Sequence, residues 1–442
     1  MNILCIGYYD KHSRFFLAIK KELSNKGLYL NFKIGSIYLS GFLYNCFRFN
    51  LNYWLPFKAW LSVIKNKKKY LRIINSKDIY KNVPYKELFN FHVKLNNEIP
   101  KERLLIQTLA YLDLFDKYFA KNKPDIILLI GDSRLCIESC VALSKLNHIK
   151  TYYIEQGPFG STILDPKGVN ANASTRDFEL KKNERVTEKQ KKKVYDFLNS
   201  PKSIKYRRSP LYRGLDFIFD FSLSKTFIYP PDLKHTDTFP FITFPKRSKS
   251  SYLKVADKKT ITYLLILQVP MDVNMIYHSP HFKNHYQILK AIYENLPQGS
   301  HLLIREHPLY KGKYEQNLYE YAQRNNIPFD NIPNLKASLD LARVVVINNS
   351  TVGIEAIALK KSVVVLGNSY YDNPKLCIKY TNNSNLKTIL KEAVDFSPLE
   401  NDINTFLYNF IESNLIKGSI TGQKLIAAKT ISQKIMSEFN MC

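Results

Sequence analysis

Apolar and polar positions form short apolar runs that are separated by segments with helical spacing. The apolar runs predict strands at residues 2–9, 28–35, 123–133, 149–157, 261–269, 301–308, 342–350 and 362–367. Helical spacing is found at 13–26, 134–147 and 285–295, and a further helix is predicted to begin near Thr351. Nearly unbroken apolar runs are typical of parallel strands that are buried on both faces. Strands and helices that alternate in this way predict an α/β fold with two Rossmann-type, doubly wound domains.

The middle of the chain interrupts this alternation. Residues 176–205 are polar, dense in lysine and glutamate and helical in spacing, and residues 209–251 carry turns, prolines and a basic cluster. A chain of 442 residues is long enough for two or three domains. We therefore predict an N-terminal Rossmann-like domain at 1–215, a connection at 216–257 and a C-terminal Rossmann-like domain at 258–442.

Polar side chains follow the predicted strand 342–350. Asn349, Ser350 and Thr351 lead into an apolar helix, and Glu355 lies one turn further on. Free N–H groups at a helix start, together with hydroxyl donors, can bind a phosphate, and a carboxylate one turn later could accept a hydrogen bond from a ribose hydroxyl. The alternative is simple capping of a helix without any ligand.

A second cluster ends the strand 301–308. Arg305 and His307 stand at its end, and Gln268 closes the strand 261–269, so parallel strands would bring all three to one edge of a sheet. An imidazole there can donate to a phosphate oxygen or transfer a proton near neutral pH. The alternative is an isolated histidine with no chemical role.

Three acids stand at other points where chemistry could take place. Asp132 and Glu155 follow two successive strands, where carboxylates could meet an acceptor sugar or a leaving oxygen, although Asp132 is equally suited to cap the helix after it. Asp232 lies in a Pro-Pro turn beside His235 in the connection, where an ordinary turn acid is the alternative.

The charge of the chain points to anionic partners. There are 65 Lys+Arg against 38 Asp+Glu, a formal net charge of +27, which attracts nucleic acid, an anionic membrane or a charged substrate. No nucleic-acid-binding motif is present, so we expect no nucleic-acid partner. Residues 42–64 mix aromatic and basic side chains and precede a lysine run at 65–69, which suits peripheral contact with an anionic membrane. A core-facing amphipathic helix with a solvated basic end is the alternative.

The lengths of the apolar stretches and the spacing of the cysteines indicate the cellular compartment and whether a metal site is expected. No window approaches the roughly 18 apolar residues of a membrane span, and the first apolar stretch is predicted to be a strand and not a signal peptide. The six cysteines are sparse and form no C-x-x-C pair, so we expect neither a disulfide framework nor a metal site. These patterns predict a cytoplasmic protein.

Several motifs together resemble a known family. They are EQGPFGSTILDPKGVN, LQVPMD, REHP, NNSTVGIEAIALKKSVVVLGNSYYDNP and IKGSI, and they run from about residue 125 to 420. This combination resembles the bacterial capsule polysaccharide biosynthesis family of retaining β-Kdo glycosyltransferases, which includes capsule linker and O-antigen enzymes. The resemblance implies a GT-B-like fold, in which an N-terminal acceptor-side domain and a C-terminal CMP-sugar-binding domain face a cleft. It also implies CMP-Kdo as donor, no metal or other cofactor, and a sugar acceptor.

The resemblance also implies roles for the residues named above. His307, Ser350 and Thr351 would contact the CMP phosphate, Glu355 the ribose, and Gln268 would line the donor pocket. We add Arg305 and Asn349 to this predicted site because of their positions. Retention by double displacement requires a carboxylate nucleophile, for which Asp232 is the best match. Glu155 would then be the acid/base, and an exchange of roles involving Asp132 stays open.

Two other functions fit the same residues. A CMP-sialic acid transferase uses the same nucleotide but inverts the stereochemistry, and a non-catalytic polysaccharide assembly factor would bind CMP without turnover. For the transferase we expect a lipid-linked glycan as acceptor, at the inner face of the cytoplasmic membrane. The sequence leaves the acceptor's identity and the linkage position open.

Overall fold

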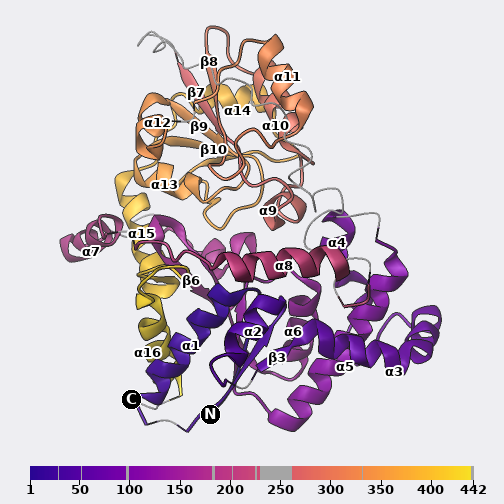
Figure 1. Ribbon diagram of the computed structural model, residues 1–442. Coiled ribbons are helices and arrows are strands. Elements are labelled where there is room, and N and C mark those ends of the chain that lie inside the picture. Colours follow the sequence, from indigo (N-terminus) through magenta and orange to yellow (C-terminus); the bar gives the residue numbers. More distant parts are fainter. Residues whose placement is uncertain are drawn as a thin grey trace. The chain divides into compact units, whose positions relative to one another are not determined.

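The protein is made of two compact α/β units. The computed structural model describes residues 1–27, 29–50, 52–95, 99–181, 185–201, 203–223, 226–228, 261–330 and 332–439. Within these ranges, the first unit comprises residues 1–169, 200–228 and 414–439, and the second comprises 170–199 and 261–413 (Figure 1). Each unit has its own sheet, so the predicted fold class of two Rossmann-type α/β units is confirmed. The predicted bounds 1–215, 216–257 and 258–442, and the cleft implied by the resemblance, stay predictions.

The first unit contains a seven-stranded sheet with the order β12-β6-β5-β4-β1-β2-β3. Its parallel part is β1 (Asn2–Gly7), β2 (Asn31–Ser36), β3 (Asn52–Trp54), β4 (Ile126–Ile130) and β5 (Lys150–Gln156). Strands β6 (Thr162–Asp165) and β12 (Leu415–Ile416) extend it with antiparallel pairs. The strand order 3-2-1-4-5 is that of a Rossmann fold.

Helices cover both faces of this sheet because successive strand residues point to opposite sides. Ile3 and Cys5 of β1 pack with α1 (Asp10–Ser24) and α16 (Ile426–Glu438), while Leu4 and Ile6 pack with α3 (Leu55–Ser76), α5 (Lys101–Asn122) and α6 (Leu135–Leu146). The unit also contains α2 (Leu39–Cys46), α4 (Asn90–Leu95) and α8 (Pro210–Leu223). The last helix of the chain thus returns to the first unit.

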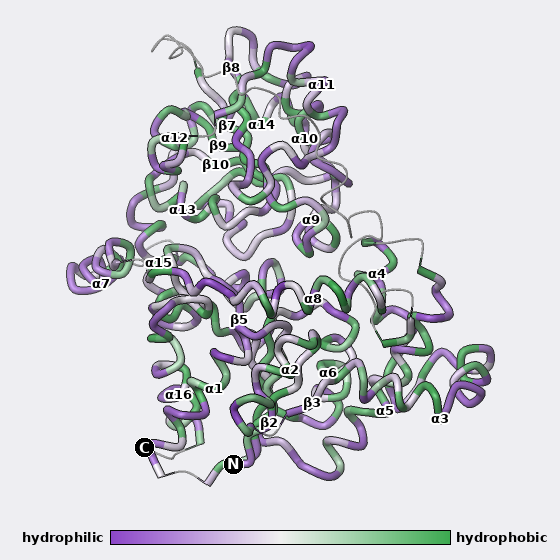
Figure 2. Tube along the Cα trace, viewed as in Figure 1, coloured by the Kyte–Doolittle hydropathy of each residue, from purple (hydrophilic) through white to green (hydrophobic). Residues whose placement is uncertain are grey.

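The second unit contains a five-stranded parallel sheet with the order β11-β10-β9-β7-β8. Its strands are β7 (Thr262–Ile266), β8 (His301–Arg305), β9 (Val344–Ile347), β10 (Ser362–Val365) and β11 (Ile378–Lys379). Their apolar character is visible in Figure 2, and β7, β9 and β10 are buried throughout. The helices are α7 (Glu188–Leu198), α9 (Val273–Ile276), α10 (His285–Glu294), α11 (Gln316–Arg324), α12 (Leu335–Leu341), α13 (Val352–Ala358), α14 (Leu386–Glu392) and α15 (Glu400–Ser413).

The structure differs from the sequence-based prediction in three places. Helix α8 lies in a region for which turns were expected. The helical spacing at 176–205 gives an α-helix only at Glu188–Leu198 among the described residues. The aromatic stretch 42–64 is not one amphipathic helix, because β3 separates α2 from α3. No helix in the described ranges is both long and apolar enough to cross a membrane.

A carboxylate between α3 and α5 organises the packing of these two helices. Asp113 accepts hydrogen bonds from the hydroxyls of Tyr70 and Tyr80, both at 2.8 Å, and pairs with Lys69 and Lys81 at 3.3 and 3.5 Å. Burial alone would raise its pKa, but the tyrosine hydrogen bonds and the two lysines outweigh burial, so the pKa of Asp113 is lowered. A lowered carboxyl pKa stabilises the fold above the pKa of the unfolded chain and loses that effect as the pH falls.

We expect Asp113→Asn to lower the free energy of unfolding of the first unit by about 1–2 kcal/mol at pH 7, because the tyrosine hydroxyls lose a charged acceptor. The difference from wild type should shrink as the pH falls below about 4. Both tryptophans lie in 39–76, so urea unfolding followed by their fluorescence reports on this unit. The control Asp116→Asn removes a pair with Lys81 at a more exposed carboxylate and should cost less than about 0.5 kcal/mol. Equal effects of both variants at pH 7 would contradict this account.

A close approach at Gly353 fixes the start of α13 against β9. A Cβ atom at this position would overlap Cδ1 of Ile347 and the hydroxyl of Tyr371. These neighbours are themselves buried. The absence of a side chain is therefore a packing requirement here.

We expect Gly353→Ala to destabilise the second unit by about 1–3 kcal/mol through overpacking. Amide hydrogen exchange should show the loss as faster exchange at 344–358. The matched control is Gly214→Ala in α8, where an added Cβ meets nothing within 4 Å, and helix propensity predicts a gain of about 0.5–1 kcal/mol. Unchanged protection of 344–358 in Gly353→Ala would show that the neighbours yield without cost.

Candidate functional site

The carboxyl ends of β7, β8, β9 and β10 meet at one edge of the second unit's sheet. Ile266 is in register with Arg305 of β8 and with Ile347 of β9, and Ile347 is in register with Val365 of β10. The residues after these strands therefore lie side by side, as ligand-binding residues do in open parallel sheets. The segments that follow are 267–272, 306–312, 348–351 and 366–373.

A buried amide pair connects the ends of β7 and β9. The backbone N–H of Asn349 donates to Oε1 of Gln268 at 3.3 Å, and Nδ2 of Asn349 donates to the carbonyls of Asn274 and His278, each at 2.9 Å. Gln268 and Asn349 are 7% and 4% exposed. Within the described part of the chain, Nε2 of Gln268 and Oδ1 of Asn349 are buried and have no hydrogen-bond partner. A buried donor and a buried acceptor left open are costly, and a polar ligand would satisfy them.

Tyr314 connects the ends of β7 and β8. Its hydroxyl donates to the carbonyl of Gln268 at 3.1 Å and accepts from the N–H of His307 at 3.0 Å. Burial raises the pKa of Tyr314, so the phenol keeps its proton. The N–H of Gln268 donates to Nε2 of His285, and burial lowers the pKa of His285 to about 3, so this ring is a neutral acceptor at physiological pH.

The ring of His307 is oriented by the loop after β8. Its Nδ1 accepts from the N–H of Leu309 at 3.3 Å. A neutral imidazole that accepts at Nδ1 carries its proton on Nε2, so Nε2 is the donor. The neighbouring Glu306 carboxylate accepts from the N–H of Gly312 at 2.8 Å and from the hydroxyl of Tyr319 at 2.6 Å, which closes the same loop.

Arg305 serves the fold at the end of β8. Its Nη1 donates to Oγ of Ser338 at 2.6 Å, its Nη2 donates to the carbonyl of Ile332 at 2.7 Å, and it pairs with Asp330 at 3.8 Å. The side chain is buried, at 7% exposure. These contacts tie β8 to α12 and to the segment before it. They favour a structural role for Arg305, so we leave it out of the proposed ligand site.

The start of α13 has an unusual cap. Thr351 occupies the N-cap with helical φ and ψ of −58° and −18° and makes no side-chain capping hydrogen bond, while Oγ of Ser350 accepts from the N–H of Val352 at 3.3 Å. The hydroxyl of Tyr371 donates to the carbonyl of Ser350. Capping therefore involves Ser350 and not the Thr351 hydroxyl.

Glu355 lies one turn into α13 and interacts electrostatically with Tyr370 from the loop after β10. Burial and, to a lesser extent, the Glu355 carboxylate hold the pKa of Tyr370 well above its usual value. The predicted ribose-binding acid therefore shares its surroundings with a neutral phenol.

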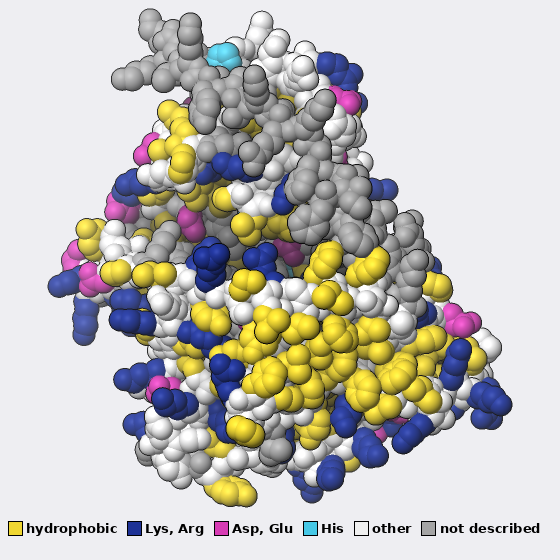
Figure 3. All heavy atoms as spheres, viewed as in Figure 1, with side chains coloured by type: hydrophobic (Ala, Val, Ile, Leu, Met, Phe, Trp, Pro, Cys, Tyr) yellow, Lys and Arg dark blue, Asp and Glu magenta, His cyan; other side chains and the backbone are white. Residues whose placement is uncertain are grey.

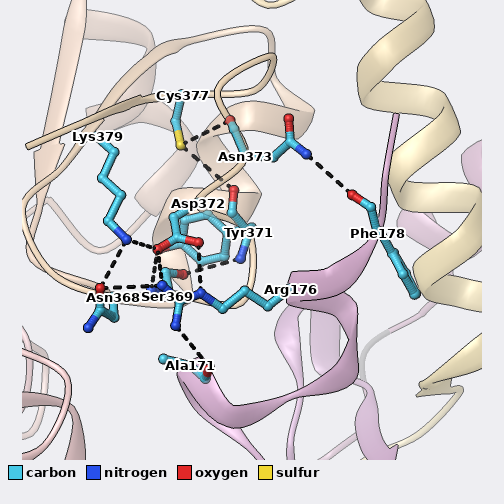
Figure 4. A network of polar contacts seen from close by, with 10 residues as sticks. All are labelled: Ala171, Arg176, Phe178, Asn368, Ser369, Tyr371, Asp372, Asn373, Cys377 and Lys379. Atoms are coloured by element: carbon cyan, nitrogen blue, oxygen red, sulfur yellow. Dashed lines mark hydrogen bonds and ion pairs between the residues drawn. The ribbon is translucent and has the colours of Figure 1, made fainter. Parts of the chain in front are cut away.

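A network of polar contacts that the sequence analysis did not anticipate holds the loop after β10 (Figure 4). Asp372 accepts from Nε of Arg176 at 3.2 Å and from Nζ of Lys379 at 2.5 Å, and Asn368 accepts from the same two side chains. The side chain of Asp372 is 6% exposed. Two cations surround one carboxylate, so the network carries a net positive charge. Burial and the charge of Arg176 lower the pKa of His278 to about 4, which places this charge near the residue whose carbonyl holds Asn349.

Asp132 and Glu155 occupy neighbouring strand ends in the first unit. The N–H of Gly131 donates to the carbonyl of Ile154, and Oε2 of Glu155 lies 3.8 Å from the Cβ position of Gly131. Asp132 does not cap α6, because the N-cap is Arg134 and Oδ2 of Asp132 instead accepts from the N–H of Val169 at 3.0 Å. The capping alternative for Asp132 is therefore wrong.

The first unit also brings a lysine toward Glu155. Burial and the charge of Arg208 lower the pKa of Lys11, and the carboxylates of Glu155 and Asp10 partly oppose that shift. Arg208 pairs with Asp10 at 2.5 Å and with Asp216 at 2.6 Å. No sequence motif indicated this group.

Asp232 lies outside the described residues. Among the residues that the structure describes, no group of three or more His, Cys, Asp or Glu side chains is arranged to hold a metal ion.

Known proteins resemble parts of this chain. Residues 246–397 match a family model described as "Capsule polysaccharide biosynthesis protein". Protein FixF of Sinorhizobium fredii (strain NBRC 101917 / NGR234) is 32% identical over 159 residues, which is 35% of this chain and 38% of that protein's length. The chain therefore aligns with well under half of this relative.

Solved structures that the chain matches include a β-Kdo 2,7 transferase, KpsC of Thermosulfurimonas dismutans, with 14% identity and a TM-score of 0.36 over 74% of this chain and 89% of that one. They also include UDP-GlcNAc 2-epimerase of Neisseria meningitidis bound to UDP-GlcNAc, with 10% identity and a TM-score of 0.35 over 99% and 100% of the two chains.

The matched segment contains the amide pair, His307 and the start of α13. Over residues 246–397 the chain matches the capsule polysaccharide biosynthesis family, in agreement with the resemblance drawn from the motifs in that segment.

Proposed function

We propose that the protein is a retaining β-Kdo glycosyltransferase that moves Kdo from CMP-Kdo to a sugar acceptor in bacterial surface polysaccharide synthesis. One observation carries the proposal. The buried pair Gln268–Asn349 leaves a donor and an acceptor open at the carboxyl edge of a parallel sheet, within the segment that matches the capsule family. The identity of the donor comes from the motif resemblance.

The proposed donor site uses groups that the structure already orients. Nε2–H of His307 and the hydroxyls of Ser350 and Thr351 would donate to the CMP phosphate, and Glu355 would accept from the ribose. Nε2 of Gln268 and Oδ1 of Asn349 would pair with polar atoms of the nucleotide.

Charge supports an anionic donor, since CMP-Kdo carries a phosphate and a carboxylate. The net positive network joins Asp372 of the loop after β10 to Arg176 and to Lys379 of β11, all in the same unit. A positive potential near a binding edge raises the local concentration of an anionic substrate.

Retention requires two displacements. In the first, the Asp232 carboxylate would attack the anomeric carbon as the bond to CMP breaks, which leaves Kdo covalently bound to the enzyme and CMP with the electron pair. In the second, the acceptor hydroxyl would attack the same carbon, Glu155 would take its proton, and Asp232 would leave as a carboxylate. Asp132 at the neighbouring strand end is the alternative to Glu155. The proposal uses no metal and places the reaction in the cytoplasm, with a lipid-linked glycan as acceptor.

We expect wild-type protein incubated with CMP-Kdo to gain the mass of one Kdo residue in intact-mass spectrometry, and Asp232→Ala to show no adduct. Transfer without any adduct in the wild type would remove Asp232 and the double displacement while keeping the donor. Turnover of CMP-sialic acid and not CMP-Kdo would favour the inverting alternative. CMP binding without turnover of either donor would favour the assembly factor.

We expect His307→Ala to weaken CMP binding about 10- to 100-fold in calorimetry, because a hydrogen bond to a charged phosphate contributes about 1.5–3 kcal/mol. The matched control is His301→Ala, at the opposite, amino end of the same strand and exposed, which should bind CMP like the wild type. Equal affinities of both variants would remove His307 from the site.

A further inference from the structure

A broad hydrophobic surface lies on the first unit over α2, β3, α3 and α8. Figure 3 shows hydrophobic side chains gathered there and lysines and arginines around them. We call this surface the aromatic face and define it by Phe42, Trp54, Phe57, Trp60, Ile64, Leu211, Ile218 and Phe219. Contiguous apolar surface of this kind on a folded domain marks an interaction site.

Trp54 holds the aromatic face together. Its ring stacks with Phe42 and Phe57 at centroid distances of 6.3 and 5.7 Å and meets Phe219 of α8 edge-on at 6.1 Å. Its Nε1 donates to the carbonyl of Ile37 at 3.2 Å, so the ring is anchored from behind. The rings thus form a preformed surface that extends to Trp60 through its contact with Phe57 at 5.6 Å.

Helix α8 is held in one orientation by its buried side. Asp216 is 6% exposed, accepts from the hydroxyl of Ser40 at 2.7 Å and pairs with Arg208 at 2.6 Å. Because this carboxylate points inward, Leu211 and Ile218, which are seven residues apart, share the outer side and are 67% and 57% exposed. A surface helix whose outer face meets only water usually carries polar residues at such positions.

Helix α3 adds basic side chains next to its apolar stripe. Phe57, Trp60 and Ile64 follow helical spacing, and Lys58 and Lys65 each come one residue, or about 100° around the helix, after Phe57 and Ile64. Lys68 comes four residues after Ile64 and continues the stripe at its C-terminal end. Ile64 is 59% exposed, and the three lysines are exposed.

All the charged side chains in the segment around this helix are basic. Residues 39–76 contain both tryptophans of the protein and no Asp or Glu. Their basic residues are Arg48, Lys58, Lys65, Lys67, Lys68, Lys69 and Arg72.

We propose that the aromatic face docks the first unit on an anionic lipid bilayer. Aromatic and aliphatic side chains would enter the headgroup region, while the lysines of α3 pair with lipid phosphates. A protein partner would need an apolar patch with acidic residues around it to match the aromatic face. An anionic bilayer presents an apolar interior beneath negatively charged headgroups everywhere on its surface. The inference rests on the face alone and not on the proposed sugar transfer.

The test uses the full-length wild type with vesicles of phosphatidylcholine, with and without phosphatidylglycerol, at low ionic strength. We expect co-sedimentation and a blue shift of tryptophan fluorescence with phosphatidylglycerol vesicles only, and a loss of binding as salt is raised. Since both tryptophans lie in 39–76, the shift reports on this region directly. Bromolipids should quench the same signal.

Two variants test the apolar and the basic parts separately. Leu211→Ser/Ile218→Ser should lower the partition coefficient at least tenfold, and Lys58→Gln/Lys65→Gln/Lys68→Gln should lower it on the order of 100-fold, about fivefold per lysine. The matched controls lie elsewhere. The apolar control is Leu399→Ser, at a leucine that is 68% exposed. The basic control is Lys189→Gln/Lys192→Gln/Lys424→Gln, at three exposed lysines. Both controls should bind vesicles like the wild type.

Three results would overturn the proposal. They are absence of binding to phosphatidylglycerol vesicles, equal binding by the two variants and their controls, and binding without any change in tryptophan fluorescence. Self-association in light scattering that Leu211→Ser/Ile218→Ser abolishes, without vesicle binding, would instead assign the face to contacts between copies of the chain. Thermal unfolding midpoints close to the wild type would confirm that the variants are folded.

Discussion

The candidate site depends on one buried side chain, Asn349. Its backbone N–H and its side-chain amide make three hydrogen bonds that join the end of β9 to the end of β7 and to the segment 274–278. The cost of leaving amide groups unpaired in a dry interior makes this arrangement specific. The same arrangement leaves Nε2 of Gln268 and Oδ1 of Asn349 buried without a hydrogen-bond partner, and the proposed donor site uses these two atoms.

Neutral hydrogen-bonding groups hold the rest of the edge in place. Tyr314 and His285 are both kept uncharged by burial, and each contacts the backbone of Gln268. Their protonation does not change near neutral pH, so the positions of Gln268 and His307 are insensitive to pH in this range.

Excess positive charge gathers in two regions of the described part of the chain. In the second unit, Arg176 and Lys379 share the buried carboxylate of Asp372 and leave a local positive surplus beside the loop after β10. In the first unit, the basic side chains of 39–76 lie beside an aromatic surface and have no acidic residue in the same segment. A protein that handles an anionic nucleotide-sugar and an acceptor in an anionic membrane would use both surpluses.

The sequence by itself determined the two α/β sheets, most of their strands and the polar residues after them. Strand periodicity and burial are local properties, and parallel strands bring their carboxyl ends to one edge in any Rossmann-type unit. Gln268, His307 and Asn349 could therefore be placed together without coordinates.

Only the tertiary structure decided which polar contacts these side chains make. Arg305 and Asp132 have the residue types and positions of site residues, and their hydrogen-bond partners Ser338 and Val169 lie in segments remote in sequence. Arg176 reaches Asp372 across 196 residues, and α8 completes the aromatic face begun by residues 42–64. Contacts between residues so far apart in sequence depend on how the helices and strands pack in three dimensions. The periodicity and spacing of residues along the chain contain no information about that packing.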